Sequence, residues 1–206
     1  MLIELADTGA ADAVQGALQD VLQAALERGL VTDAALAASE AQRAAFWLVR
    51  HSVSEANKKA GVGLTTDCAV PISAVPRFIT EATRAVRAFV PDMEVLVVAH
   101  LGDGNAHFIP FLRFAAWEAL PDRDAAASAI KRSVNDVAHA LGGTFSAEHG
   151  IGRTLLGEMA AYKPAVELEL MRSIKQALDP HNLFNPGRLL PARSPIAVHR
   201  PAQEAS

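Results

Sequence analysis

The stretch that decides the fold lies near the middle of the chain and reads Glu94-Val-Leu-Val-Val-Ala99, His100-Leu-Gly-Asp-Gly-Asn-Ala-His107, Phe108-Ile-Pro-Phe111. Its outer pieces are rich in β-branched and apolar residues, which favour strands, and its centre carries turn residues that tolerate positive φ. The pattern predicts an antiparallel β-hairpin with residues 102–105 as the loop. In that register His100 lies opposite His107, on the same face of the sheet, with Cβ atoms roughly 4.5–5.5 Å apart.

A second segment, Ser146-Ala-Glu-His-Gly-Ile-Gly152, adds a carboxylate and another imidazole. Two imidazoles in register can bind one metal ion, and Glu148 would complete a set of two histidines and one carboxylate that leaves coordination positions open for substrate. His149 would then remain as a base. The alternative is that these histidines are surface residues or hydrogen-bonded core residues, which is the commoner role of a lone histidine near a strand.

The composition narrows the class of protein. The 206 residues suffice for one large or two small domains, and the net charge of −4 argues against nucleic-acid binding because no basic patch dominates. The single cysteine, Cys68, excludes an intrachain disulfide, and we expect it to be a small buried side chain rather than a nucleophile. Because no apolar run is long enough for a membrane span and no signal-peptide pattern opens the sequence, we expect a cytoplasmic protein, with peripheral association at the inner face of a membrane left open.

Helices and strands alternate along the chain. The hydrophobic periodicity predicts further strands at 1–6, 33–38, 67–71 and 144–147, and helices at 12–28, 39–58, 73–89, 122–141, 150–162 and 164–178. We expect residues 191–206, which are proline-rich and polar, to form a disordered tail. Because the clearest strand connection is an antiparallel hairpin, the predicted fold class is α+β, with helices packed on one antiparallel sheet.

Four segments together resemble a known family. The segments 67–73, 100–107, 146–152 and 174–188 are similar, in the right order, to the C-terminal domain of FAD-linked oxidases, the vanillyl-alcohol-oxidase type that includes D-lactate, glycolate and D-2-hydroxyglutarate dehydrogenases. The resemblance implies a ferredoxin-like cap domain over residues 1–190, with helices on one side of the sheet. It also implies FAD-dependent oxidation of a small D-2-hydroxy acid, with electrons passed to an acceptor that the sequence does not identify.

The same resemblance assigns roles to individual residues. It implies that a zinc-like divalent metal is bound by His100, His107 and Glu148 and that His149 abstracts the substrate's hydroxyl proton. It further implies that Arg50 grips the substrate carboxylate, and that Asn185, with Glu148 and His149, approaches the flavin.

Two positions depart from the pattern of relatives that take a dicarboxylic acid. Thr65 stands where those relatives have a lysine, and Ile109 stands where they have an asparagine. Both changes remove polar contacts to a second carboxylate. The sequence therefore favours a monocarboxylic substrate such as D-lactate, or a longer apolar hydroxy acid.

The sequence has no glycine-rich segment that could bind the diphosphate of FAD. Its two glycine-containing candidates, Gly142-Gly143 and the segment 149–152, do not form a G-x-G-x-x-G fingerprint. We expect this chain to lack the N-terminal FAD-binding domain. That domain would be its partner, either in the same protein or as a separate subunit. Formation of a homodimer is left open. Two other classes remain: a metal-dependent hydrolase that uses His100, His107 and Glu148 without flavin, and a non-catalytic cap module that binds a partner chain.

Overall fold

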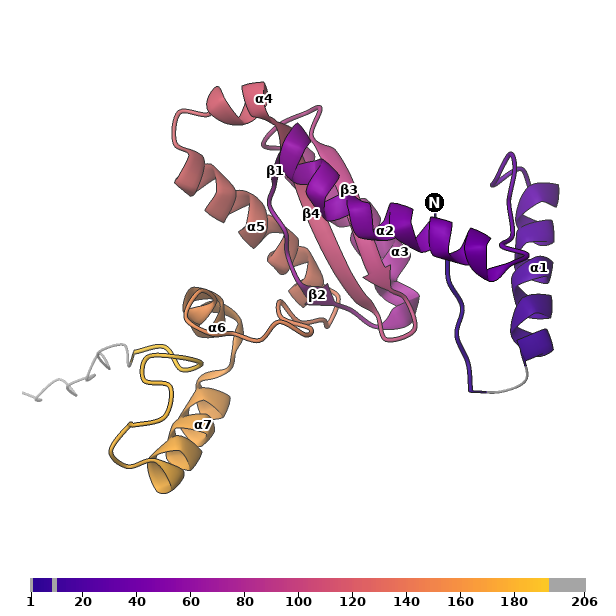
Figure 1. Cartoon of the computed structure of the whole chain (residues 1–206). Helices are drawn as coiled ribbons and strands as arrows, with labels where there is room; N and C mark the ends of the chain where they lie inside the picture. Colours follow the sequence, from indigo (N-terminus) through magenta and orange to yellow (C-terminus); the bar gives the residue numbers. More distant parts are fainter. Residues whose placement is uncertain (1, 9–10, 193–206) are drawn as a thin grey trace, which may run out of the picture. The chain divides into compact units, whose positions relative to one another are not determined.

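A computed structural model describes residues 2–8 and 11–192 (Figure 1). The chain divides between Ala60 and Gly61 into two compact units, and each is described here by itself. Most of the tail predicted to be disordered, residues 193–206, lies outside the described residues. Among the described residues, no helix combines the length and the apolar character needed to cross a membrane.

The first unit contains two helices, α1 (Ala11–Glu27) and α2 (Glu40–Ala60), close to their predicted ranges. Ser39 caps α2, because its Oγ accepts a hydrogen bond from Gln42 N at 3.3 Å while Ala38 N donates to Gln42 Oε1 at 2.7 Å. The strands predicted at 1–6 and 33–38 are wrong: residues 2–6 and 33–38 form no strand. A strand needs the backbone of a neighbour, and neither segment pairs with one in the described part of the chain.

The second unit is built on an antiparallel sheet whose central strand is β4 (Asn105–Arg113). One edge of β4 pairs with β3 (Glu94–His100), and the other edge pairs with β1 (Gly61–Gly63) and β2 (Cys68–Ala69). β1 and β2 follow the same register on β4. Backbone hydrogen bonds from Leu64 N to Pro110 O (2.8 Å) and from Thr66 N to Phe108 O (3.0 Å) join them into one extended segment, residues 61–69.

A short fourth strand position lies beyond β2. Thr144 N donates to Ala69 O at 2.8 Å and Ala69 N donates to Thr144 O at 3.1 Å, so the strand predicted at 144–147 is reduced to isolated bridges. Helix α3 (Val75–Arg87) connects β2 to β3, and α5 (Arg123–Ala140) follows β4. The sheet order of 144–146, the 61–69 segment, β4 and β3 is that of a ferredoxin-like sheet. The predicted α+β class with this sheet is confirmed.

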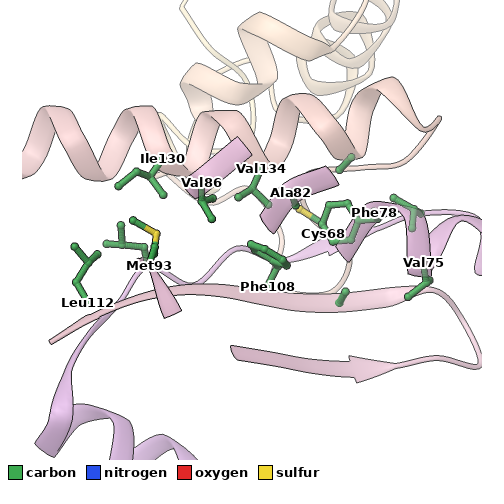
Figure 2. Packing of buried hydrophobic residues seen from close by; sticks show 14 residues of the cluster. Cys68, Val75, Phe78, Ala82, Val86, Met93, Phe108, Leu112, Ile130 and Val134 are labelled. Carbon is green, nitrogen blue, oxygen red and sulfur yellow. The ribbon is translucent and has the colours of Figure 1, made fainter. Parts of the chain in front are cut away.

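Helices α3 and α5 cover one face of the sheet, and the hydrophobic core lies between these helices and the sheet (Figure 2). Phe108 of β4 is fully buried, and its ring meets Phe78 of α3 edge-on with centroids 5.7 Å apart. Cys68 is also fully buried, as expected, and burial raises the pKa of its thiol to about 12. Most of the other core side chains come from β4, α3 and α5: Val75, Ala82, Val86, Ala106, Leu112, Ile130, Val134 and Ala138. Leu64, Val70 and Met93 join them from the connecting segments.

The remaining elements surround this sandwich. They are η1 (Ile72–Ala74), α4 (Phe114–Glu118), α6 (Leu156–Tyr162) and α7 (Ala165–Leu178). A second, smaller apolar cluster of Phe145, Met159 and Leu168 joins α6 and α7 to the segment after α5. The hydroxyl of Tyr162 donates to Asp136 Oδ1 at 2.7 Å and so links α6 to α5.

The predicted hairpin is present, but the predicted pairing of its histidines is wrong. His100 lies opposite Asn105, and His107 lies opposite Val98. The loop is 101–104 because Asp103 Oδ1 accepts from Asn105 N at 2.9 Å in an Asx-type turn, which returns Asn105 to the strand. The observed partner of His100 lies two positions from the predicted one, at Asn105 rather than His107. Successive side chains of a strand alternate between its two faces, so a shift of two positions does not change the face. Both histidines therefore keep the predicted common face.

Gly104 is the position in this turn that needs glycine. Its φ is +79°, and a Cβ there would lie 2.0 Å from Val70 O. We expect Gly104→Ala to lower the free energy of unfolding by about 2–5 kcal/mol, through left-handed strain and steric overlap. The measurement is urea unfolding followed by circular dichroism.

The matched control is Gly102→Ala in the same loop, where a Cβ would meet nothing within 4 Å. Equal unfolding midpoints for the two variants would contradict the assignment of the turn.

Candidate metal centre

The sheet face opposite the helices carries the predicted histidines. His107 projects from the middle of the sheet, with 13% of its side chain exposed. The ring of His100, at the end of β3, lies at a steep angle to that of His107, with centroids 6.1 Å apart. On its other side His107 stacks on His149, with centroids 5.2 Å apart and 14° between the ring planes. The three imidazoles therefore gather at one end of this face.

The segment that carries Glu148 and His149 is held by the carboxylate of Asp67. Asp67 Oδ2 accepts hydrogen bonds from the backbone N–H groups of Ala147, Glu148 and His149 at 3.0, 3.0 and 2.8 Å. Asp67 is buried, at 7% exposure. Burial acts to raise the pKa of this carboxyl, but the backbone hydrogen bonds and the nearby His149 outweigh it, so the pKa lies below its ordinary value.

Four side chains converge at this point. Asp67, His107, Glu148 and His149 each offer a ligand atom, and these atoms all lie within 4.8 Å of one another. Glu148 Oε1 lies 3.1 Å from His107 Nε2 and 3.4 Å from His149 Nε2. Asp67 lies at the opposite ring edges, 3.7 Å from the Nδ1 atoms of both histidines. We call Asp67, His107, Glu148 and His149 the His–carboxylate cluster.

Buried polar atoms without a hydrogen-bond partner concentrate in the same place. Across residues 2–8 and 11–192 they are Asp67 Oδ1, Asn105 Oδ1, His107 Nδ1 and Ser146 Oγ. The four residues lie on neighbouring strand positions, since Asp67 bridges to Ser146 and the 61–69 segment runs beside β4. Such atoms are rare in folded proteins, and their concentration here is typical of a site that binds a polar ligand. Imidazole nitrogens with carboxylate oxygens form the donor set that suits a zinc-like divalent ion.

The predicted site residues are placed as follows. The cluster includes His107, Glu148 and His149, and His100 lies beside it but outside it. Arg50 is half-buried on α2 in the first unit, so its position relative to the cluster is not described. Asn185 lies in an exposed turn after α7, with φ of +48°, where its carbonyl accepts from Arg188 N.

Asp67 was not among the residues predicted for the site. The residue stands at the start of the 67–73 segment, directly before Cys68. Its hydrogen-bond partners lie 80–82 positions further along the chain. Periodicity and turn chemistry are local signals and do not report a contact at that separation.

We expect Asp67→Asn to lower the free energy of unfolding by about 1–3 kcal/mol at neutral pH, because three charge-assisted hydrogen bonds are weakened. The folded-state pKa is lowered, so the carboxylate's contribution is fully present above its ordinary pKa of 3.8 and is lost as pH falls through the lowered value. The difference between wild type and variant should therefore shrink below about pH 4. The measurement is chemical unfolding at a series of pH values.

Asp33→Asn is the control, since this exposed carboxylate accepts from one backbone N–H only. A stability loss from Asp67→Asn that stays constant down to the lowest pH would contradict the account.

Comparison with known proteins finds similarity to one family, both in a family model and in individual relatives. The family model "FAD linked oxidases, C-terminal domain" matches residues 1–189. The chain is 34% identical over 178 residues to a D-2-hydroxyglutarate dehydrogenase of Xanthomonas citri pv. viticola, covering 86% of this chain and 37% of the relative. It is 33% identical over 175 residues to the mitochondrial D-2-hydroxyglutarate dehydrogenase of Arabidopsis thaliana (84% and 29%). It is also 32% identical over 173 residues to a glycolate oxidase subunit of Escherichia coli K12 (84% and 32%).

The chain thus spans about a third of the length of the curated relatives that it matches. The match runs through both units and includes the hairpin and the 146–152 segment. The chain belongs to the family of FAD-linked oxidases, as their C-terminal domain.

Proposed function

We propose that this chain is the substrate-binding part of an FAD-dependent dehydrogenase of D-2-hydroxy acids. The observation that carries the proposal is the convergence of His107, Glu148 and His149 on the sheet face left free by α3 and α5, in a chain of this family. The names of the relatives, a dehydrogenase of D-2-hydroxyglutarate and a glycolate oxidase subunit, support a 2-hydroxy acid as the substrate class.

His107 and Glu148 would hold a divalent metal ion, with His100 as the third ligand. The 3.1 Å between His107 Nε2 and Glu148 Oε1 is typical of two atoms that share one ion, and the His100 ring lies beside them. When bound, such an ion lowers the pKa of a hydroxyl that it contacts. Glu148 supplies negative charge that offsets the ion, and the half-buried His107 keeps water from one side of it.

His149 would take the proton of the substrate hydroxyl. Its side chain is 58% exposed, so it can reach a substrate, and its stacking on His107 fixes the plane of its ring. A neutral imidazole is a suitable proton acceptor near pH 7. Arg50 would bind the carboxylate through the planar fork of its guanidinium.

The flavin would be held mainly by polypeptide outside these 206 residues. The relatives are about three times as long as the segment they share with this chain, and the sequence holds no dinucleotide fingerprint. When bound, FAD accepts the hydride from the α-carbon of the substrate. Asn185, in its exposed turn, would contact the flavin in that assembly, and the chain alone would be inactive.

The substrate's side chain would lie on an apolar surface. Ile109 follows His107 on the same face of β4 and pairs with Leu96 of β3, and both are half-buried. Thr65, on the neighbouring 61–69 segment, adds no charge. A second carboxylate would find no cation among these residues. This favours D-lactate or a longer apolar hydroxy acid over a dicarboxylic substrate.

Metal binding by the chain tests the first part of the proposal. In calorimetric titrations with Zn²⁺, we expect His100→Ala, His107→Ala and Glu148→Ala each to weaken binding by at least about tenfold, since each removes a ligand. His149→Ala should change the affinity by less than about threefold, because a base makes no bond to the ion. His181→Ala, in an exposed loop, is the control.

If His149→Ala weakens binding and His100→Ala does not, the ligand and the base are assigned the wrong way round. If no variant binds differently from wild type, the metal site itself is refuted.

Kinetics test the second part, in an assembly that contains the flavin-binding polypeptide. With D-lactate as substrate, His149→Ala should lower kcat by about 10²–10⁴-fold, because it removes the proton acceptor. Arg50→Ala should mainly raise KM, because the carboxylate contact already exists in the ground state. Excess metal should partly restore Glu148→Ala and leave His149→Ala unchanged.

Rescue of His149→Ala by metal would contradict the role of His149. Turnover of esters or amides without flavin would point instead to a metal-dependent hydrolase.

A further inference from the structure

We propose that Asp67 is a positioning residue that fixes the tautomer of His107. In this arrangement His107 carries its proton on Nδ1, directed at Asp67 Oδ1, and presents the lone pair of Nε2 toward Glu148. The inference deepens the proposed function, on which its significance rests, but the tautomer itself is a property of the chain without metal.

The unpaired atoms of the site are the first observation. Oδ2 of Asp67 already accepts three backbone hydrogen bonds, whereas its Oδ1 is buried without a partner. His107 Nδ1 is also buried without a partner, and the two atoms lie 3.7 Å apart. An ionised carboxylate only accepts hydrogen bonds, so a bond between these atoms requires the proton on Nδ1. The proposal requires these two atoms to approach from 3.7 Å to hydrogen-bond distance, about 3 Å.

The two carboxylates near His107 compete for its proton, and their exposure decides between them. Glu148 Oε1 lies closer, 3.1 Å from Nε2, but the Glu148 side chain is 47% exposed. The Asp67 side chain is 7% exposed. Water can satisfy Glu148, whereas leaving Asp67 Oδ1 and His107 Nδ1 both unpaired costs the desolvation of two buried groups. A hydrogen bond in this buried place is also stronger than one at the surface.

The backbone contacts of Asp67 connect this tautomer to the rest of the site. The same carboxylate holds the N–H groups of residues 147–149, so it also sets where the Glu148 side chain begins. Metal-ligating histidines commonly donate their second ring N–H to a carboxylate, which orients the ring and raises the basicity of the ligand nitrogen. Asp67 therefore places the Nε2 lone pair and the Glu148 carboxylate side by side.

The test is long-range ¹H–¹⁵N NMR of the metal-free chain labelled with ¹⁵N-histidine at neutral pH, with the His107 signals assigned from a His107→Gln spectrum. We expect wild-type His107 to be protonated at Nδ1 and unprotonated at Nε2. In Asp67→Asn the amide can donate to Nδ1, so the tautomer should reverse, and Zn²⁺ affinity should fall by about 10–100-fold.

Asp103→Asn is the matched control, because Asp103 also accepts a backbone N–H in this hairpin and no contact joins it to His107. It should leave the tautomer unchanged. Glu148→Gln provides an independent test at an exposed position that does not depend on the folding of Asp67→Asn: the Nδ1–H tautomer should persist there.

Protonation of wild-type His107 at Nε2 would overturn the proposal, as would loss of the Nδ1–H tautomer in Glu148→Gln or its persistence in a folded Asp67→Asn. A chain with the expected tautomer and no affinity for Zn²⁺ would refute the proposed metal site while leaving the inference intact.

Discussion

The carboxylate of Asp67 is the contact on which the candidate site depends. It lies on the 61–69 segment beside β4 and accepts three consecutive backbone N–H groups from a segment some 80 residues away. Ala147 N also donates to the backbone O of Asp67 at 3.0 Å, where Asp67 and Ser146 form an isolated bridge. The carboxylate continues this short pairing, because it accepts the N–H groups of Glu148 and His149.

Side chains alternate along β4, so one face of the sheet carries core residues and the other carries His107 of the His–carboxylate cluster. Ala106, Phe108 and Leu112 point into the core under α3 and α5. His107 and Ile109 point to the other face, where polar and apolar groups stand side by side. Because α3 and α5 pack on one face, the other carries the His–carboxylate cluster, where a substrate would bind in the proposed function. The period of the strand therefore places the core side chains of β4 and His107 on opposite faces of the sheet.

Sequence patterns predicted most helices well and the long-range contacts poorly. The helix predicted at 150–162 begins only at Leu156, and α4 was not predicted. The ranges expected for α1 and α7 differ from the observed ones by a residue or so, since an apolar stripe is a local property. The predictions of strands at 1–6 and 33–38 were wrong, because a strand forms only where a neighbouring segment pairs with it, and the segment's own sequence does not show that neighbour. The hairpin register failed by two positions, because the side chain of Asp103 ends the turn at Gly104. His107, Glu148 and His149 were expected in one place and are found together, but Asp67, which brings them there, gave no local signal.

In the proposed function, His107 and Glu148 share one divalent ion on the sheet face opposite α3 and α5. Crystals of the chain grown with Zn²⁺ and measured across the zinc absorption edge test it most directly. We expect one anomalous peak about 2.0–2.2 Å from His107 Nε2 and from a Glu148 oxygen, with His100 completing the set. Zinc bound elsewhere, or no peak at this face at saturating zinc, would contradict it.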